Sequence, residues 1–440
     1  MKSLKSLIAI LFILVPLSVF SQTVSGTFFN LPQQKVYLNA YTGLYMEVLD
    51  SVMMSHDKRV DFNTQLTKGM YQIETEYGYV WDFLYDGSPV KMVVRDVDDE
   101  AVGFIGSKIN TDWNAYKIYK KRTMNSFSEL RPLDNEHAVK EYNDLQNLFW
   151  SFTDSLSLDD NYSSVLIRVD RFPAFNPALD YDKQRKEIIA SFFDEVDFKD
   201  LSLIPTDVLN NKILDFLSLQ ISPEQDVKQM MMSLILGADN VLYRASVDFE
   251  MYKFVFQFLM ETFKLMNLDE VVDYMTRIPY SEELKCDKNQ YDELLTIAEF
   301  NSRVRIGSKA ENISGTTIFD EEFDLYEIES EYVIVYFWSY TCDHCKDNIK
   351  RFKSFFEQNP EISMVAISVK GDVKKIRSLV KRYKVNSYFY YDGLEWNSPH
   401  VNDYAVTATP SFYVLDKNKN IIYKPFDFEE LVQFVNIIKR

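Results

Sequence analysis

The sequence predicts a multidomain protein with a β-rich N-terminal module, an all-α middle region and a C-terminal α/β domain. Three patterns along the chain lead to this fold class. Apolar and polar residues alternate before about residue 110, and apolar residues recur at helical spacing between 111 and 300. After residue 305, strand-like and helix-like runs follow one another in turn. A length of 440 residues suits roughly two to four domains.

The first segment, residues 22–110, carries the alternation typical of half-buried strands. Val36, Leu38 and Ala40 are separated by more polar residues, and Tyr71 and Ile73 flank Gln72 in the same way. Such strands bury one face and leave the other in water. We therefore expect a small antiparallel sandwich or barrel, a β-sandwich-like module.

The second segment, residues 111–300, has helical periodicity. Apolar residues spaced i, i+3, i+4 and i+7 lie on one face of a helix. We interpret these stripes as core and not as a ligand groove, and we expect Ser222 followed by Pro223 to begin a helix. Two such stripes are Leu145, Leu148, Phe149 and Phe152, and Phe256, Leu259, Met260 and Phe263.

The third segment, residues 305–440, alternates between the two kinds of element. The run 332–338 is apolar throughout, as in a strand buried on both faces. The predicted strands are 332–338, 362–369, 411–415 and 421–424, and the predicted helices are 346–357, 373–383 and 428–439. This order predicts an α/β domain whose last two strands form a hairpin.

The first 21 residues have the composition of a signal peptide. Lys2 and Lys5 precede the apolar run 7–15, and cleavage is expected before Gln22. The alternative is an uncleaved anchor, but the run is short for a membrane span and is followed by Pro16. We expect export to the periplasm or outer cell envelope of a bacterium, without stable membrane insertion after cleavage.

Composition and charge exclude two classes of protein. Hydrophobic residues make up 46% of the chain and charged residues 26%, a mixture that rules out large-scale disorder. The formal net charge is −18, so the chain repels phosphate backbones and nucleic acid is excluded as a partner.

The chain has three cysteines, Cys286, Cys342 and Cys345. Three are too few for a scaffold held together by disulfides, and the spacing of the last two indicates chemistry instead. We expect Cys286 to be a small buried hydrophobic residue of the helical region. A third redox thiol and an intermolecular disulfide are the alternatives for it.

Cys342 and Cys345 follow a predicted strand and begin a predicted helix, which is the context that makes a CxxC motif specific. A helix N-terminus stabilises a thiolate, and the thiolate is the form that attacks a disulfide. Cys342 is therefore the expected nucleophile and Cys345 the resolving thiol. Between them, His344 favours the Cys342 thiolate, whereas Asp343 disfavours it by like-charge repulsion.

Three stretches resemble thioredoxin-fold proteins of the TlpA/ResA type. They are the active-site segment 336–345, YFWSYTCDHC, the opening segment 305–310, RIGSKA, and the second signature 408–416, ATPSFYVLD. The resemblance covers the last third of the chain. It implies a cis proline at Pro410 facing the disulfide, backbone groups of Thr409 offered to the substrate chain, and Trp338 packed beside the site.

Two positions depart from that family. Thioredoxins have a buried acid six residues before the first cysteine, where this chain has Tyr336, and ResA-like proteins have a Glu where this chain has Asn348. Proton transfer from Cys345 therefore needs another group. The candidates are His344, Asp347 and water.

Three other interpretations of the CxxC pair fit the sequence less well. A zinc site needs four ligands, and no second paired motif is present. An inert structural disulfide fits poorly at a junction between a strand and a helix. A peroxide-reducing enzyme has Thr three residues before its cysteine, where this chain has Ser339. We expect neither a metal nor a cofactor.

Two hypotheses for function follow. The first is a thiol–disulfide oxidoreductase that exchanges electron pairs with protein cysteines, leaning to a disulfide reductase supplied by an unidentified electron donor. The second is a client- or ligand-binding protein in which residues 22–300 capture the partner and the thioredoxin-like domain, 305–440, is secondary.

Overall fold

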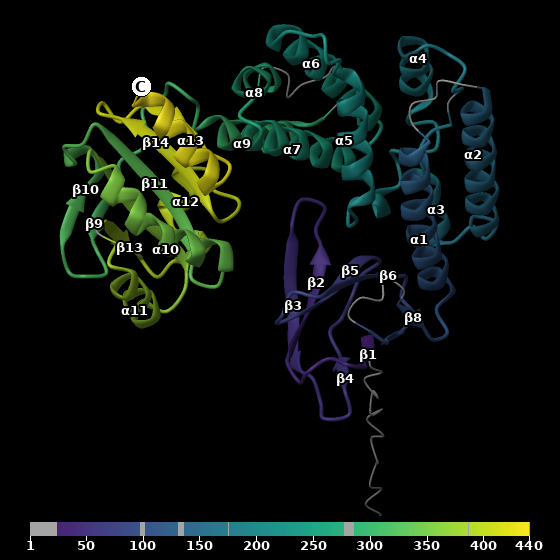
Figure 1. Cartoon of the computed structure of the whole chain (residues 1–440), viewed down its shortest axis with the longest axis horizontal. Helices are drawn as coiled ribbons and strands as arrows, with labels where there is room; N and C mark the ends of the chain where they lie inside the picture. Colours follow the sequence, from purple (N-terminus) through teal and green to yellow (C-terminus); the bar gives the residue numbers. More distant parts are fainter. Residues whose placement is uncertain are drawn as a thin grey trace, which may run out of the picture. The chain divides into compact units, whose positions relative to one another are not determined.

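The computed structural model describes residues 24–96, 102–130, 136–174, 176–276, 286–385 and 387–439 (Figure 1). The predicted signal peptide, 1–21, lies outside these residues. By packing, the chain divides into two compact units, 1–219 and 220–440. The predicted division into 1–21, 22–110, 111–300 and 305–440 follows from secondary-structure content and stays a prediction. The packing boundary between the two units falls within the predicted segment 111–300.

The first unit begins with two four-stranded sheets that share one hydrophobic core, so this module is a sandwich. The first sheet has the order β4-β1-β7-β8 and the second the order β3-β2-β5-β6. The strands are β1 (Val24–Phe28), β2 (Lys35–Tyr41), β3 (Met46–Met53), β4 (Arg59–Phe62), β5 (Gly69–Thr75), β6 (Val80–Tyr85), β7 (Val90–Val94) and β8 (Gly103–Phe104).

The predicted alternation holds in β5, where Tyr71 and Ile73 are buried, and in β2, where Val36 and Leu38 are buried and the half-buried Ala40 packs against the same core. The register of β2 with β3 shifts between Leu38 and Asn39, where the pairing skips one residue of β3. Asn39 is also buried, on the other side of the strand, and donates a hydrogen bond to Glu74 at 2.8 Å. The prediction of purely antiparallel sheets is wrong at one place, because β1 pairs with β7 in parallel.

Five helices complete the first unit. Asn110 ties the first of them to the sandwich, because its side chain accepts a hydrogen bond from Leu84 N–H at 2.7 Å and donates one to the Leu84 carbonyl at 2.9 Å. The predicted stripe on α2 is partly wrong, because Leu148 is exposed while Phe149 is buried. The helices are α1 (Lys108–Glu129), α2 (Glu136–Leu156), α3 (Tyr162–Asp170), α4 (Tyr181–Ser191) and α5 (Val208–Gln220).

The second unit begins with four helices in its described part. The apolar face that the sequence predicted for one of them, α7, is buried. Phe256, Leu259, Met260 and Phe263 are fully buried in α7. The predicted helix start at Ser222 is wrong. Asp226 caps α6 instead, in a capping box with Gln229 that satisfies the free N–H groups better than Ser222 would. The helices are α6 (Val227–Ala245), α7 (Phe249–Leu265), α8 (Asp269–Met275) and α9 (Lys288–Ser302).

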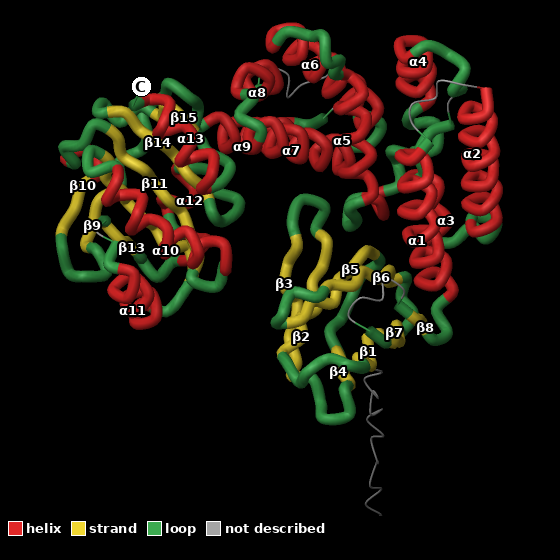
Figure 2. The backbone as a smooth tube through the Cα atoms, viewed as in Figure 1, coloured by secondary structure: helices red, strands yellow, loops and turns green. Residues whose placement is uncertain are grey.

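The C-terminal domain is the predicted α/β domain, with a mixed sheet of order β13-β12-β11-β14-β15 (Figure 2). Strand β11 runs parallel to β12 and antiparallel to β14, and β14 and β15 form the predicted hairpin. The sequence did not indicate β9, β10, β13 or α12. The elements are β9 (Ser314–Thr316), β10 (Glu322–Asp324), β11 (Tyr332–Ser339), α10 (Asp343–Gln358), β12 (Ile362–Lys370), α11 (Val373–Tyr383), β13 (Tyr388–Tyr390), α12 (Pro399–Asp403), β14 (Ser411–Asp416), β15 (Ile421–Tyr423) and α13 (Phe428–Ile438).

The central strand β11 supplies both cores of this domain. Tyr336 and Trp338 pack on one face with residues of α10, α11 and α13, whereas Val335 and Phe337 pack on the other face with residues around α12. Successive side chains of a strand point to opposite faces, so this division follows from the sequence of the strand. Cys345 belongs to the first of these cores.

A buried ion pair joins helix α8 to the C-terminal domain. Lys424 Nζ lies 2.7 Å from Asp269 Oδ1, and the Lys424 side chain is only 8% exposed. Asp269 also accepts a hydrogen bond from the Ile306 N–H at 2.8 Å, and Asn267 donates one to the Lys424 carbonyl at 2.8 Å. The corner between α7 and α8 is therefore fixed against the segment that leads from β15 to α13.

None of the helices in the described part of the chain combines the length and the hydropathy that a membrane crossing requires.

Replacing Lys424 with Met is expected to destabilise the second unit by about 3 kcal/mol, because it leaves the Asp269 carboxylate without its buried partner. Urea unfolding of the full chain measures the change. The matched control is Lys353→Met, which breaks the exposed Lys353–Glu357 pair and is expected to cost less than about 1 kcal/mol. Equal losses in the two variants would show that the pair at Asp269 does not hold the unit together.

Candidate active site

The cysteine pair lies at the junction between strand β11 and helix α10. β11 ends at Ser339, and Cys342 is the N-cap residue of the helix that begins at Asp343. The N-cap residue accepts a hydrogen bond from a free backbone N–H of the first turn. Here the acceptor is sulfur, because the Cys345 N–H donates to Cys342 Sγ over 3.2 Å. The structure has the pair as a disulfide, with its Cα atoms 5.3 Å apart.

The two sulfurs differ in their access to solvent. Cys342 is partly exposed, whereas Cys345 is fully buried beside Ile349 in the core cluster. A partner molecule therefore meets Cys342 first. When the pair is reduced, the N–H group of Cys345 and the positive end of the helix dipole both favour the thiolate at Cys342.

Thr409 and Pro410 lie opposite the pair. The antiparallel register of β11 and β14 sets Phe337 against Ser411, which brings the residues before β14 next to the end of β11. The Thr409–Pro410 peptide bond is cis. Cys342 Sγ lies 3.7 Å from the Thr409 carbonyl oxygen, so the sulfur faces backbone groups of this segment.

The charges next to Cys342 largely cancel. Asp343 forms an ion pair with Lys346 at 2.5 Å, and its carboxylate is exposed to water. Both factors weaken the like-charge repulsion predicted for Asp343. His344 is exposed and lines a groove beside the pair.

The surroundings of Cys345 are apolar on one side. Trp338 is fully buried in the same core cluster, and its Nε1 has no hydrogen-bond partner among the described residues. Tyr336 is also fully buried, and its hydroxyl donates to the Cys345 carbonyl at 3.3 Å. Burial raises the pKa of Tyr336 far above its ordinary value, so this hydroxyl keeps its proton at neutral pH.

Two further positions bear on the proton of Cys345. Asn348 is buried one turn into α10 and carries no titratable group. Asp347 is exposed and bonded to Lys350, and this hydrogen bond holds the pKa of Asp347 below its usual value. Asp347 is therefore a weak proton acceptor, which leaves His344 and water among the predicted candidates.

A groove of about 640 Å³ opens beside the disulfide. Its walls come from four places: the start of α10, the segment 408–413 around Pro410, the segment 424–429 before α13, and the corner between α7 and α8. The last wall consists of Lys264, Leu265 and Asn267. Leu265 is 55% exposed, and Phe426, in the segment before α13, is 71% exposed.

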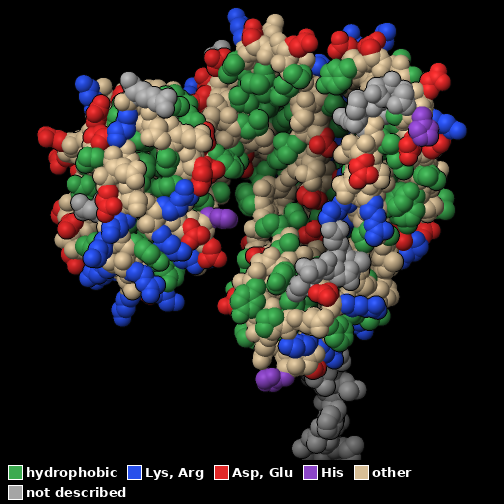
Figure 3. Space-filling view, viewed as in Figure 1, with side chains coloured by type: hydrophobic (Ala, Val, Ile, Leu, Met, Phe, Trp, Pro, Cys, Tyr) green, Lys and Arg blue, Asp and Glu red, His purple; other side chains and the backbone are tan. Residues whose placement is uncertain are grey.

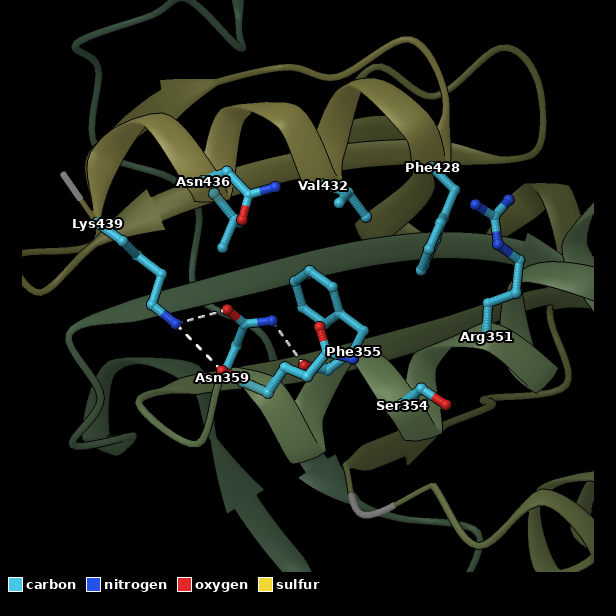
Figure 4. Close-up of a pocket in the computed structure, with 10 residues that line it drawn as sticks. Arg351, Ser354, Phe355, Asn359, Phe428, Val432, Asn436 and Lys439 are labelled. Atoms are coloured by element: carbon cyan, nitrogen blue, oxygen red, sulfur yellow. Dashed lines mark hydrogen bonds between the residues drawn. The ribbon is translucent and has the colours of Figure 1, made fainter.

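A second cavity, of about 380 Å³, lies between α10 and α13 (Figure 4). Phe355 on α10 and Val432 on α13 point into it, and at one end Lys439 donates a hydrogen bond to Asn359 at 2.7 Å. Neither cysteine lines either cavity, but the first groove is lined by His344, which lies between the two cysteines, and by Thr409, whose carbonyl faces Cys342 Sγ. We therefore place the reaction beside the first groove.

Sequence reasoning missed the α7–α8 corner and Phe426 as parts of this region, and it gave Tyr340, within the active-site segment 336–345, no role of its own. Tyr340 packs against the core cluster together with Cys342. The signal available in the sequence was weak, because a lone exposed Leu or Phe is ordinary on a protein surface. Their significance comes only from being brought beside the cysteines.

Residues 330–421 match a family model described as thioredoxin-like. The C-terminal domain is thioredoxin-like. This confirms the fold that the sequence predicted for the last third of the chain. No curated protein matches the chain.

Solved structures similar to this chain include a thioredoxin-like protein from Bacteroides caccae, with 17% identity over 61% of this chain and 98% of that one, at a TM-score of 0.41. A domain of a possible thiol-disulfide isomerase from Cytophaga hutchinsonii has 26% identity over 31% and 94%, at a TM-score of 0.28. The thioredoxin domain of a thiol-disulfide oxidoreductase from Bacteroides vulgatus has 16% identity over 31% and 99%, at a TM-score of 0.29.

Outside the thioredoxin-like domain, Cys286 is a free thiol just before α9 and is half-buried, less enclosed than predicted. Across the described ranges, no group of three or more His, Cys, Asp and Glu side chains is arranged to hold a metal ion.

The unequal exposure of the two sulfurs predicts selective alkylation. In a Cys286→Ser background, reduced protein treated with iodoacetamide is expected to be modified at Cys342 at least about ten times faster than at Cys345, because only the former is accessible and stabilised as a thiolate. Mass spectrometry of tryptic peptides measures both rates, with unfolded protein as the control. Equal rates in the folded protein would contradict the geometry described here.

Proposed function

We propose that this protein is an exported thiol–disulfide oxidoreductase that exchanges electron pairs with protein cysteines through Cys342 and Cys345. The observation that carries the proposal is the position of Cys342. Cys342 is partly exposed, and its sulfur accepts a hydrogen bond from the first turn of α10 and faces the carbonyl of Thr409, a residue that lines the groove. A nucleophilic thiol needs these three features: access, stabilisation of the anion and a surface for the partner.

The exchange takes two steps. The Cys342 thiolate attacks one sulfur of the client disulfide, forms a mixed disulfide and releases the client's other sulfur as a thiolate. The sulfur of Cys345, after losing its proton, then attacks Cys342, forms the Cys342–Cys345 disulfide and releases the client's remaining thiolate. Two electrons pass from the enzyme to the client, and both client thiolates take up protons from water.

We propose net transfer in the direction of client reduction. We choose this direction of electron transfer because the segment 336–345 resembles proteins of the TlpA/ResA type. Continued turnover then requires a donor of two electrons, a dithiol that attacks the Cys342–Cys345 disulfide in the same manner. Export rests on the composition of residues 1–21, and the periplasm or outer envelope is the proposed compartment.

A second function, capture of a client by the residues that precede the thioredoxin-like domain, is favoured by one observation. Leu265 and Asn267, at the α7–α8 corner, line the same groove as Pro410. The two functions are compatible in this form, because the captured client is the one whose disulfide is reduced.

Replacing Cys342 with Ser is expected to reduce the rate of protein disulfide reduction to the uncatalysed background, since Ser supplies no thiolate. Turbidity of insulin in the presence of dithiothreitol measures the rate. Cys345→Ala is expected to accumulate mixed disulfides with clients, because the resolving sulfur is gone. Cys286→Ser is the control and is expected to retain the rate. Full activity in Cys342→Ser would refute the proposed function.

Replacing Phe426 with Ser is expected to raise KM for a protein disulfide roughly five- to thirtyfold, equivalent to about 1 to 2 kcal/mol of lost apolar burial against the client. The reaction of the same variant with a small disulfide such as cystine is expected to stay unchanged, because cystine does not span the groove. Ile437→Ser is the matched control, since Ile437 is similarly exposed, at 67%, and lines neither cavity. A rise in KM for cystine would indicate damage to the site itself.

A further inference from the structure

Helix α11 gives an acidic protein one strongly basic face. Between positions 370 and 384 the sequence has seven Lys and Arg and a single acid, Asp372, whereas the whole chain has 48 Lys and Arg against 66 Asp and Glu. We call the exposed cations of this stretch the α11 patch. Figure 3 shows Lys and Arg gathered over the part of the C-terminal domain where Figure 1 places α11. The patch consists of Lys370, Lys374, Lys375, Lys381, Arg382 and Lys384.

These cations are not neutralised within the described structure. None of them forms an ion pair with any residue in the described ranges, although many other Lys and Arg of the chain do. Asp372 is occupied as the N-cap of α11, where it accepts a hydrogen bond from the Lys375 N–H at 3.0 Å. Unpaired charges of one sign on one helix create a local positive potential that a folded protein does not need for stability.

The patch contains a pocket of about 260 Å³. Three cations, Lys374, Lys375 and Arg382, surround it, and the apolar part of its wall comes from Leu379 and the ring of Tyr340. Such a lining suits a carboxylate on a short aliphatic stem, because the cations hold the charge and the apolar groups cover the methylenes.

Tyr340 connects this pocket to the nucleophile. The Tyr340 N–H donates to the Lys370 carbonyl at 2.9 Å, and Gly371 lies so close that a Cβ added there would be 2.7 Å from Tyr340 Cβ. Tyr340 is also two residues before Cys342, so their Cα atoms are at most about 7.6 Å apart. The start of α11 is thereby held beside the reactive sulfur.

A partner bound for disulfide exchange has to cover this surface. Its own sulfur must come within bonding distance of Cys342, and a protein interface of ordinary size buries about 800 Å² on each side, a disc of roughly 16 Å radius. A disc of this size centred on Cys342 reaches Tyr340 and therefore the pocket that Tyr340 lines with residues of α11.

We propose that the α11 patch recognises acidic protein partners, and that it selects a cysteine or disulfide flanked by Asp and Glu for reaction at Cys342. This inference rests on the proposed function and adds the chemistry of the partner to it. The pocket at Tyr340 takes one partner carboxylate, and the remaining cations speed the encounter by long-range attraction. Like charge elsewhere on this acidic chain disfavours the same partner at other surfaces.

The experiment compares disulfide-bridged peptides of equal length whose cysteines are flanked by Glu, Ser or Lys, with full-length protein and dithiothreitol as donor. At low ionic strength we expect kcat/KM to be at least about tenfold higher for the Glu peptide than for the Ser peptide, and lowest for the Lys peptide. At 0.5 M salt the difference is expected to shrink to about twofold, because exposed charges are then screened.

Lys374→Gln/Lys375→Gln/Arg382→Gln is expected to bring kcat/KM for the Glu peptide down to that for the Ser peptide. The matched control, Lys186→Gln/Lys228→Gln/Lys288→Gln, removes the same charge from exposed positions on other helices and is expected to keep the full preference. Equal loss in both variants would assign the preference to net charge and overturn the proposal.

Three further outcomes are distinguishable. Equal reduction of all three peptides by the wild type would refute the patch as a recognition surface and leave the oxidoreductase intact, whereas no reduction of any peptide would refute the proposed function. Sedimentation with vesicles of anionic phospholipid, lost in the α11 triple variant and accompanied by no peptide preference, would assign the patch to membranes and overturn the proposal.

Discussion

The site depends on one hydrogen bond, from the Cys345 N–H to Cys342 Sγ, made at the point where a buried strand becomes a helix. A helix must satisfy its first N–H groups, and here a sulfur does so instead of the usual oxygen. The same contact that begins α10 therefore prepares Cys342 to carry negative charge. The cost of stabilising that anion is met by backbone groups that the fold requires in any case.

Strand β11, which precedes the cysteine pair, determines which side chains surround Cys345. Since the side chains of β11 alternate, Tyr336 and Trp338 lie on the face that also receives Cys345, and Phe337 lies on the other. The resolving cysteine is consequently enclosed by aromatic rings. Tyr336 and Asn348, at the positions where thioredoxins and ResA-like proteins have acids, offer no ionisable group at neutral pH, so the proposed exchange needs another route than these two positions for the proton of Cys345.

Around this centre the chain presents two different surfaces. On the side of Pro410, an apolar groove is completed by Leu265 from the α7–α8 corner, which the buried pair of Lys424 and Asp269 fixes in place. On the side of Tyr340 lies the basic face of α11. In the proposed function, a partner that reaches Cys342 meets both surfaces, one selecting by shape and apolar contact and the other by charge.

The sequence by itself determined the elements with strong periodicity: β11, β12, α10, α11, the hairpin of β14 and β15, and the apolar face of α7. These patterns are local, so a short window contains their cause. It also located the cysteine pair, because the CxxC spacing and the strand before it are adjacent in the chain. Only the tertiary structure decided the short strands β9 and β13, the parallel pairing of β1 with β7, the bulge after Leu38 and the convergence of Leu265 and Phe426 on the site. Each of these depends on contacts between residues distant in sequence, where packing outweighs local preference.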